Sequence, residues 1–432
     1  MALVPLLLVL CSLASGWILE SPSAEERLFR RLTLDAAGTP QPARAAAALS
    51  NPTGLLVVGL RIFATEFRRD RVVVAPTARA RRRNGDARGE WRVFADRGPH
   101  CARRFPESAV DCAILDGAWG LASYRSTLFV SSFGSDQVLA FDRKTRAFLY
   151  ALGGGGSLDS PEGLALAGTR LFVSSFLDSR VVAFELEPSL EQRAAAAAAA
   201  SSDAHATLAL GPPVEIDLEA TQFRADSTFG EVAARSERRR AAALWGEQSE
   251  ESDEAPFHAR MHGPEQLVYV AGRGSLVVSS SHNESVLEIG AQDGQLRSVL
   301  ADAADGLQGP LGLALAAPNA SGPLRAVLRW ESAVPEAVLL VASYRSDAVY
   351  ALDLSLNSPR LEKLPLADKR LVGPSAIALD ARDPSALYLA CYETGAVLYF
   401  NVSEIHERHR ADAAFLMSTS SSPHQRRRTL AE

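Results

Sequence analysis

The sequence predicts an all-β protein, a six-bladed β-propeller of four-stranded antiparallel blades with helical or disordered insertions, and three observations support this prediction. One block of residues, an apolar run, a tight polar turn and a second apolar run, occurs six times in the 432 residues. The shortest separation between copies, from Gly120 to Gly163, matches the ~40–45 residues of a four-stranded blade. Apolar and polar residues alternate within the copies, as they do in strands separated by turns.

The six copies begin near residues 52, 118, 161, 264, 310 and 374. In the second copy "LFVSSFGSDQVLAFD" spans 128–142, and in the third "LFVSSFLDSRVVAF" spans 171–184. We interpret each stretch as a second strand, a turn and a third strand, so the Ser-Ser pair belongs to a repeated strand position rather than to a catalytic site.

Aligning the copies gives three columns of equivalent residues. We name the third the turn column, because short polar side chains can bond the local backbone in tight turns. The small-residue column contains Glu66, Ser132, Ser175, Ser280, Ser343 and Cys391. The next column contains Phe67, Phe133, Phe176, Ser281, Tyr344 and Tyr392. The turn column contains Asp70, Asp136, Ser179, Glu284, Asp347 and Gly395.

We expect the propeller to span 17–404, with insertions at 76–116 and 188–262 and a disordered tail at 405–432. The larger insertion contains "AAAAAAASS" and "EQSEESDE", low-complexity runs that predict a helix and a surface loop. A propeller ring needs a closing device where its termini meet, so we predict that "RLFRRLTL" at 27–34 supplies the outer strand of the last blade.

The charge of the chain argues against nucleic acid as a partner, because 45 basic and 51 acidic residues are spread evenly and give a net charge of -6. Residues 1–16, "MALVPLLLVLCSLASG", are typical of a signal peptide, and their apolar run is too short for a transmembrane segment. We therefore expect a protein that is secreted or stays in the lumen of the secretory pathway, without a transmembrane segment and as a monomer.

Three cysteines lie after the signal peptide. Cys101 and Cys112 flank a short loop that a disulfide bond would close, and two free thiols are the alternative. Cys391 falls in the small-residue column and is expected to be a buried, inert thiol. Sequons for N-glycosylation, which fit a secreted glycoprotein, occur at Asn283, Asn319 and Asn401.

The repeat resembles a known family. The motif Pro-x-Gly-[Leu/Ile]-Ala, followed by Leu-[Phe/Tyr]-Val-[Ala/Ser], resembles NHL-type repeats, and "LFVSSFGSDQVLAFDRKT" is similar to the related YVTN-type repeat. The resemblance covers six short blocks across most of residues 52–403 and implies a six-bladed propeller. The chain departs from the NHL pattern where an Asp commonly follows the small residues of the second strand, since Phe, Tyr or Ser stands there. Function does not follow, because propellers include enzymes, receptors and scaffolds.

The residue x of each Pro-x-Gly start is expected to lie at the mouth of the central channel. Resemblance to virginiamycin B lyases would place histidines at this position, and none is present: the six residues are Thr53, Trp119, Glu162, Glu265, Leu311 and Ser375. Glu66, Glu162 and Glu265 are candidate ligands of a divalent cation such as calcium, as in the six-bladed calcium-dependent lactonases and esterases. The alternative is that these glutamates are solvated or paired with arginines.

The histidines predict no metal site on their own. His258 and His262 in "HARMH" have a zinc-compatible spacing, but nearby proline and glycine leave little room for a helix. "HERH" at 406–409 has a similar spacing, and His282 is the histidine within a hairpin of the repeat.

The favoured hypothesis is a binding or scaffold module for a protein, peptide or glycan partner, for which no cofactor is expected. The alternative is a cation-dependent hydrolase, lactonase-like or esterase-like, or a lyase, with its active site at the channel mouth. The sequence identifies no catalytic residues for it and leaves enzymatic activity undecided.

Overall fold

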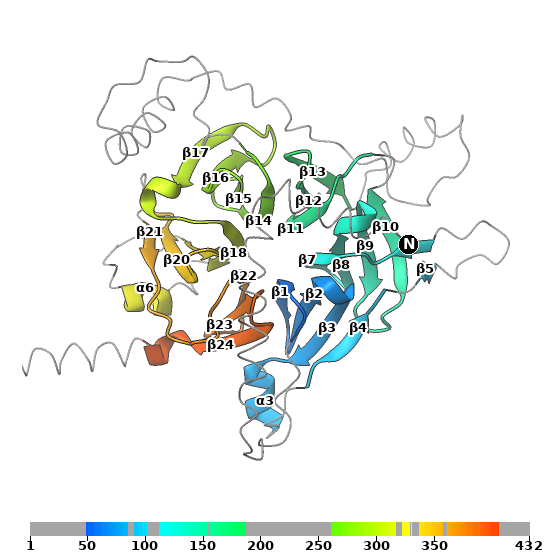
Figure 1. Cartoon of the computed structure of the whole chain (residues 1–432), viewed down its shortest axis with the longest axis horizontal. Coiled ribbons are helices and arrows are strands. Elements are labelled where there is room, and N and C mark those ends of the chain that lie inside the picture. Colours follow the sequence, from blue (N-terminus) through cyan, green and yellow to red (C-terminus); the bar gives the residue numbers. More distant parts are fainter. Residues whose placement is uncertain are drawn as a thin grey trace, which may run out of the picture. The chain divides into compact units, whose positions relative to one another are not determined.

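Six antiparallel sheets arranged as the blades of a ring make up the described part of the protein (Figure 1). The computed structural model describes residues 49–84, 90–97, 99–101, 112–153, 156–186, 261–316, 322–328, 330, 337–356 and 361–405. All of them belong to one compact unit, Ala48–Glu432. The inner strand of each blade contacts the inner strands of both neighbours, and the first blade contacts the sixth. The predicted six-bladed propeller is therefore confirmed.

Each blade begins with an inner strand, followed by a second and a third strand. The inner strands are β1 (Pro52–Val58), β7 (Ala118–Tyr124), β11 (Pro161–Ala167), β14 (Pro264–Val270), β18 (Pro310–Ala316) and β22 (Pro374–Asp380). The second strands are β2 (Arg61–Glu66), β8 (Thr127–Ser132), β12 (Arg170–Ser175), β15 (Ser275–Ser280), β19 (Val338–Ser343) and β23 (Asp383–Cys391). The third strands are β3 (Arg71–Pro76), β9 (Gln137–Asp142), β13 (Arg180–Glu185), β16 (Ser285–Gly290), β20 (Ala348–Asp353) and β24 (Ala396–Asn401).

Outer strands complete four of the blades within the described residues, and the sheets of the third and sixth blades have three strands there. The outer strands are β4 (Arg92–Ala95), β10 (Phe148–Gly153), β17 (Leu296–Ala301) and β21 (Leu361–Lys363). Strand β4 lies inside the predicted insertion 76–116, so part of that segment belongs to the first blade. The signal peptide, the predicted closing strand at 27–34, nearly all of the segment 188–262 and nearly all of the tail lie outside the described residues. In the part of the chain that is described, no helix is long and apolar enough to cross a membrane.

The second strands are apolar on both faces because the blades stack face to face. Successive side chains of a strand point to opposite faces. In β8, Leu128 and Val130 pack with Phe63 of the first blade, whereas Phe129 packs with Leu171 of the third blade. Each of the six boundaries between blades contains one such buried cluster.

The first serine of the Ser-Ser pair joins adjacent blades near their inner strands. Ser131 Oγ accepts a hydrogen bond from Gly120 N at 2.6 Å and donates to Glu162 O of the next blade at 2.5 Å. Ser174 repeats the arrangement with Gly163 N and Glu265 O. The inner strands approach so closely that a Cβ on Gly120 would lie 2.1 Å from Glu162 O, which is why the motif needs glycine there.

The second serine of the pair binds a backbone amide. This amide belongs to the residue two positions before the inner strand. Ser132 Oγ accepts a hydrogen bond from Asp116 N at 2.8 Å, and Ser175 Oγ accepts one from Asp159 N at 2.8 Å. The same bond is made in two further blades, by Ser280 to His262 N and by Ser343 to Gln308 N. Both serines are therefore structural, as the repeat predicts.

The turn column forms a clasp between neighbouring blades. All six of its residues have positive φ, and so do the six residues that directly precede the inner strands. Asp136 Oδ1 accepts a hydrogen bond from Ser160 N of the next blade at 2.8 Å, and Asp347 Oδ1 accepts one from Gly373 N at 2.7 Å. Asp70 makes the equivalent bond to Gly117 N. Asp suits this position because it tolerates the left-handed region better than most residues do.

The boundary between the sixth and first blades uses other contacts. Gly395, which has no side chain to form the clasp, accepts a hydrogen bond from Leu49 N at its carbonyl oxygen at 2.8 Å. Helix α3 (Ala78–Asn84), which follows β3 in the first blade, packs against the sixth blade. Tyr388 Oη accepts a hydrogen bond from Ala78 N at 2.8 Å in the buried part of this contact.

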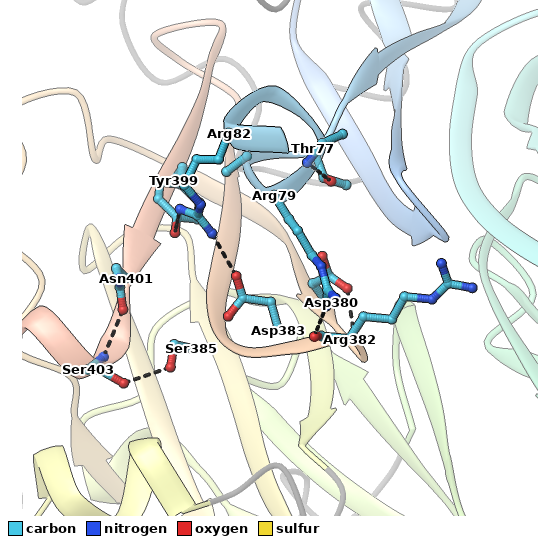
Figure 2. Close-up of polar contacts among 12 residues, drawn as sticks. Thr77, Arg79, Arg82, Asp380, Arg382, Asp383, Ser385, Tyr399, Asn401 and Ser403 are labelled. Carbon is cyan, nitrogen blue, oxygen red and sulfur yellow. Dashed lines mark hydrogen bonds and ion pairs between the residues drawn. The ribbon is translucent and has the colours of Figure 1, made fainter. Parts of the chain in front are cut away.

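Arginines of α3 add polar contacts at the surface of the same boundary (Figure 2). Arg82 forms an ion pair with Asp383 at 2.8 Å and donates to Tyr399 Oη at 3.1 Å. Arg79 donates to Arg382 O. Helix α3 is thus a latch from the first blade onto the sixth.

The two loop cysteines lie in a short hairpin, β5 (Pro99–Cys101) and β6 (Cys112–Ile114), in which Cys101 is the register partner of Cys112. Opposed residues of an antiparallel pair have Cα atoms about 4.5–5.5 Å apart, within the range that a disulfide bond spans. The disulfide bond stays a prediction. Cys391 is a buried free cysteine, and burial raises the pKa of its thiol to about 11.

The three sequons differ in their surroundings. Asn283 is 4% exposed and accepts a hydrogen bond from Ser285 Oγ at 3.1 Å, so the folded protein does not present it for glycosylation. Asn401 is half-buried at the end of β24, and Asn319 lies outside the described residues. Glycosylation at Asn319 and Asn401 stays a prediction.

The clasp can be tested at Asp347. Replacing it with Ala removes the hydrogen bond to Gly373 N. The alanine must also adopt the positive φ of 48° without a polar side chain that could bond the local backbone. We expect Asp347→Ala to lower the free energy of unfolding by about 2 kcal/mol, and Asp347→Asn, which keeps an acceptor and tolerates this φ, by less than about 1 kcal/mol. Urea unfolding of the two variants checks this, and equal losses would contradict the clasp.

The latch can be tested by comparing its buried and exposed contacts. Tyr388→Phe leaves Ala78 N unsatisfied at a buried site, and we expect a loss of about 1–3 kcal/mol in the free energy of unfolding. Arg82→Ala removes a pair whose arginine is 56% exposed, and we expect a loss below about 1 kcal/mol. Denaturant unfolding measures both, and the reverse order would show that the surface contacts carry the latch.

Candidate functional site

The starts of the inner strands and the turns between second and third strands meet at one end of the ring, which we name the turn face. Strands in each blade are antiparallel, so these two segments must lie at the same end. A backbone hydrogen bond joins them in every blade, for example Phe133 N to Gly117 O at 3.0 Å and Tyr392 N to Gly373 O at 2.8 Å. The turn face is therefore where the variable residues of the repeat converge.

Aromatic side chains form a continuous row across the first four blades of the turn face. We name Phe67, Trp119, Phe133, Phe176, His282 and His262 the aromatic row. The ring centroids of Phe67 and Trp119 are 5.1 Å apart, and those of Trp119 and Phe133 are 5.8 Å apart. Phe67, Trp119 and Phe133 are half-buried, so part of each ring faces solvent. Such partly exposed rings offer apolar area to a partner at low entropy cost.

The row continues into the third and fourth blades. Phe133 contacts Phe176 at 6.4 Å, Phe176 contacts His282 at 5.0 Å, and His282 contacts His262 at 4.7 Å. Burial and the neighbouring His262 lower the pKa of His282. The sequence singled out His262 for a different partner, His258, which lies outside the described residues together with 406–409.

Two tyrosines occupy the turn face of the fifth and sixth blades. The rings of Tyr344 and Tyr392 are 6.1 Å apart, and Tyr344 Oη donates a hydrogen bond to Glu393. Burial and the Glu393 carboxylate raise the pKa of Tyr344. Arg345 pairs with Glu284 of the fourth blade at 3.2 Å, so this side of the turn face contains paired charges.

Glu66 performs the structural task of the second serine. It is fully buried, and its Oε1 accepts a hydrogen bond from Ser50 N at 2.8 Å, the bond that serines make in other blades. Arg69 pairs with the same carboxylate at 3.1 Å, and Arg71 pairs with Oε2. Its oxygens are thus occupied by a backbone amide and two arginines.

Glu162 and Glu265 form a buried carboxyl pair. They are 1% and 7% exposed, and their side chains are hydrogen-bonded to each other. Ser281 Oγ donates a further bond to Glu265 Oε1 at 2.9 Å. A carboxylate only accepts hydrogen bonds, so the bond between the two groups requires a proton on one of them. Burial raises the pKa of Glu265, and the hydrogen bonds from Glu162 and Ser281 oppose the rise in part.

The structure thus brings two of the three predicted cation ligands together and gives the third another role. The described residues contain no group of three or more His, Cys, Asp or Glu side chains that could hold a metal ion. Glu66, Glu162 and Glu265 are all described, and a cation held by these glutamates stays a prediction. Arginines pair with Glu66, whereas Glu162 and Glu265 are hydrogen-bonded to each other.

The other x positions add no titratable group. Thr53 and Ser375 are buried, and their hydroxyls donate to carbonyl oxygens of neighbouring inner strands, Ala118 O and Pro52 O. Trp119 and Leu311 are half-buried. Trp119 is the x residue that joins the aromatic row.

Carboxylates flank the aromatic row in the second and third blades. Asp116 and Asp159 occupy equivalent positions two residues before the inner strands, and Asp136 and Asp178 lie in the turns. Burial, followed by repulsion from Asp136 and Asp178, raises the pKa of Asp159. The local potential of these two blades is therefore negative.

Comparison with known proteins identifies no family for this chain. No protein-family model matches the chain, and no curated protein matches it, so membership of the NHL family is not confirmed. A Bacteroides thetaiotaomicron protein of unknown function is similar in structure, with 11% identity, a TM-score of 0.49 and coverage of 84% of this chain and 72% of that chain.

Two further structures are similar. For a chain of the nidogen–laminin complex the identity is 13%, the TM-score 0.45 and the coverage 80% of this chain and 90% of that chain. For virginiamycin B lyase from Staphylococcus aureus the identity is 10%, the TM-score 0.41 and the coverage 81% of this chain and 94% of that chain. Similarities at this level carry no argument about function.

The carboxyl pair predicts a specific dependence of stability on pH. Because the pKa of Glu265 is raised in the folded state, the folded protein keeps a proton that the unfolded chain loses above the ordinary value of 4.5. Wild-type stability therefore falls as pH rises from that value through the raised pKa. Glu265→Gln lacks this loss, so we expect its Tm to increase relative to wild type between about pH 5 and about pH 8.

Thermal unfolding at constant ionic strength measures this difference. Glu362→Gln, on the outer strand β21, serves as the surface control and is expected to show a smaller trend with pH. A constant Tm difference between Glu265→Gln and wild type over the whole range would contradict the raised pKa.

Proposed function

We propose that this β-propeller is a binding module that engages a protein, peptide or glycan partner through the aromatic row of its turn face. The observation that carries the proposal is the contiguous contact of Phe67, Trp119 and Phe133 with part of each ring exposed. Aromatic side chains of this kind dominate the energy of binding interfaces, because they bury a large area with few rotatable bonds. The propeller scaffold fixes their positions.

The placement of the row supports binding rather than core packing alone. Trp119 begins an inner strand and Phe133 begins a turn, and both lie outside the buried clusters between the blades. The hydrogen bonds of the Ser-Ser pair and of the clasp hold the two backbone segments. The row is therefore a preorganised surface, which lowers the entropy cost of association.

The alternative, a cation-dependent hydrolase or lyase, receives less support from the same residues. Its ligand set was Glu66, Glu162 and Glu265, of which the first is paired with arginines and the other two with each other. A thermal-shift screen with calcium alone tests it directly, because a cation bound only by the folded state raises Tm. We further propose that the module acts in the secretory pathway or outside the cell, from the apolar run at 1–16.

Binding can be tested with the fluorescently labelled full-length protein on peptide and glycan arrays. We expect wild type to bind a subset of the array, and Trp119→Ala and Phe133→Ala to weaken the best interaction at least about tenfold, since each removes a central ring. Tyr124→Ala is the matched control, because Tyr124 is also half-buried but ends β7 at the opposite end of the blade. It should change the affinity by less than about twofold.

Unfolding curves confirm that the three variants are folded before the arrays are read. Absence of any bound peptide or glycan for wild type, or equal effects of Tyr124→Ala and Trp119→Ala, would overturn the proposal.

A further inference from the structure

The aromatic row is accompanied by carboxylates that form no ion pair within the described residues, although the positive charge of Arg180 lowers the pKa of Asp159 and so opposes part of its rise. Of the ion pairs within the described residues, none includes Asp116, Asp136 or Asp159, whereas Asp178 is paired with Arg180. Asp136 uses one oxygen for the clasp to Ser160 N, and its other oxygen is not needed there. Asp136 is exposed and Asp116 is half-buried, so both can meet a partner.

The carboxylate of Asp116 lies beside the rings. A Cβ on Gly134 would be 3.0 Å from the Asp116 carboxyl carbon, so this carboxylate lies against the turn that Phe133 begins. A Cβ on Gly117, next to Asp116, would be 2.9 Å from the Phe67 ring. Cationic side chains favour the faces of aromatic rings and also favour carboxylates, so one cation would satisfy both groups.

A buried carboxyl of the neighbouring fourth blade lies on the inner strand β14. Glu265 is 7% exposed, and its Oε2 is buried without a hydrogen-bond partner among the described residues. Its carboxyl lies at the turn face, because it is bonded to Ser281 in the turn of the fourth blade and to Glu162 at the start of β11. Because Glu265 is already engaged by Ser281 and Glu162, it does not enter the proposed contact.

The negative charge is confined to one sector. On the first blade Arg68 and Arg69 are exposed beside Phe67, and on the fifth blade Arg345 pairs with Glu284. The carboxylates of the first blade, Glu66 and Asp70, are paired with arginines. A partner that contacts Asp116 and Asp159 must therefore be basic over Trp119 and Phe133.

Building on the binding function proposed above, we propose that the turn face of the second and third blades binds a basic peptide segment, whose Lys or Arg side chains contact Phe133 and Trp119 and pair with Asp116 and Asp159. The aromatic rings supply the apolar contact, and the carboxylates select the sign of the partner. A neutral glycan would use the rings alone and would not respond to the carboxylates.

The test is fluorescence anisotropy of the full-length protein with three labelled probes. The basic probe is an eight-residue peptide in which glycine alternates with lysine or arginine, and the matched probes carry glutamine or glutamate at the charged positions. We expect the basic probe to bind at least about tenfold more tightly than the glutamine probe, and its Kd to rise with salt because exposed charges are screened.

Paired variants then locate the site. Asp116→Asn/Asp159→Asn keeps side-chain shape but removes two charges, and we expect it to weaken the basic probe at least about fivefold with no effect on the glutamine probe. Asp293→Asn/Glu362→Gln removes two charges at a turn between β16 and β17 and on β21, and should change Kd by less than about twofold. Thermal unfolding verifies that both double variants are folded.

The outcomes separate the two proposals. Equal affinity for the basic and glutamine probes, or an unchanged Kd in Asp116→Asn/Asp159→Asn, overturns the basic segment. If the basic probe fails while array ligands still depend on Trp119, the binding function stands and this inference is wrong. If neither the basic probe nor any array ligand binds, both fail.

Discussion

The close approach of adjacent inner strands is the constraint on which the rest of the structure depends. With six blades around one axis, the backbone of each inner strand meets the carbonyl oxygen of the next, as at Gly120 and Glu162 O. Four of the six blades have glycine at this position, namely Gly54, Gly120, Gly163 and Gly312, and the carbonyl needs a donor. Ser131 supplies it from the neighbouring strand of its own blade, so one hydroxyl satisfies two inner strands.

This constraint also gathers the variable residues at one place. Because every inner strand is pinned at its start, the residue x and the turn of each blade lie at the same end of the ring. Positions that all blades must share are used by the scaffold, and positions that differ are free to serve a partner. Glu66 shows that the division is not absolute, since it differs from its equivalents and yet makes their bond to the backbone.

The fold could be predicted from the sequence because the residues that determine it recur at equivalent positions of the repeat. They are the starts of the inner strands and the residues with positive φ in the turn column. The candidate site could be predicted only in part. The x positions identified Trp119, Glu162 and Glu265 but not the hydrogen bond between Glu162 and Glu265, because a hydrogen bond between blades depends on side-chain direction. The contact of His262 with His282 was missed since His262 precedes its strand by two residues, outside the columns considered.

Other features were beyond the sequence because they break the repeat. Helix α3 is short and lies in a basic run that reads as a solvated loop, and only its contact with Tyr388 reveals its role. The burial of Asn283 could not be predicted either, because a sequon identifies an asparagine that can be glycosylated but does not indicate whether its side chain is exposed.

In four blades the clasp joins a carboxylate or hydroxyl of the turn, from Asp70, Asp136, Ser179 or Asp347, to the backbone amide that precedes the inner strand of the following blade. The same contact could join any number of successive blades. Gly395 ends this series, because the sixth blade has no side chain to offer a seventh. A blade appended after the sixth would therefore lack this side-chain contact.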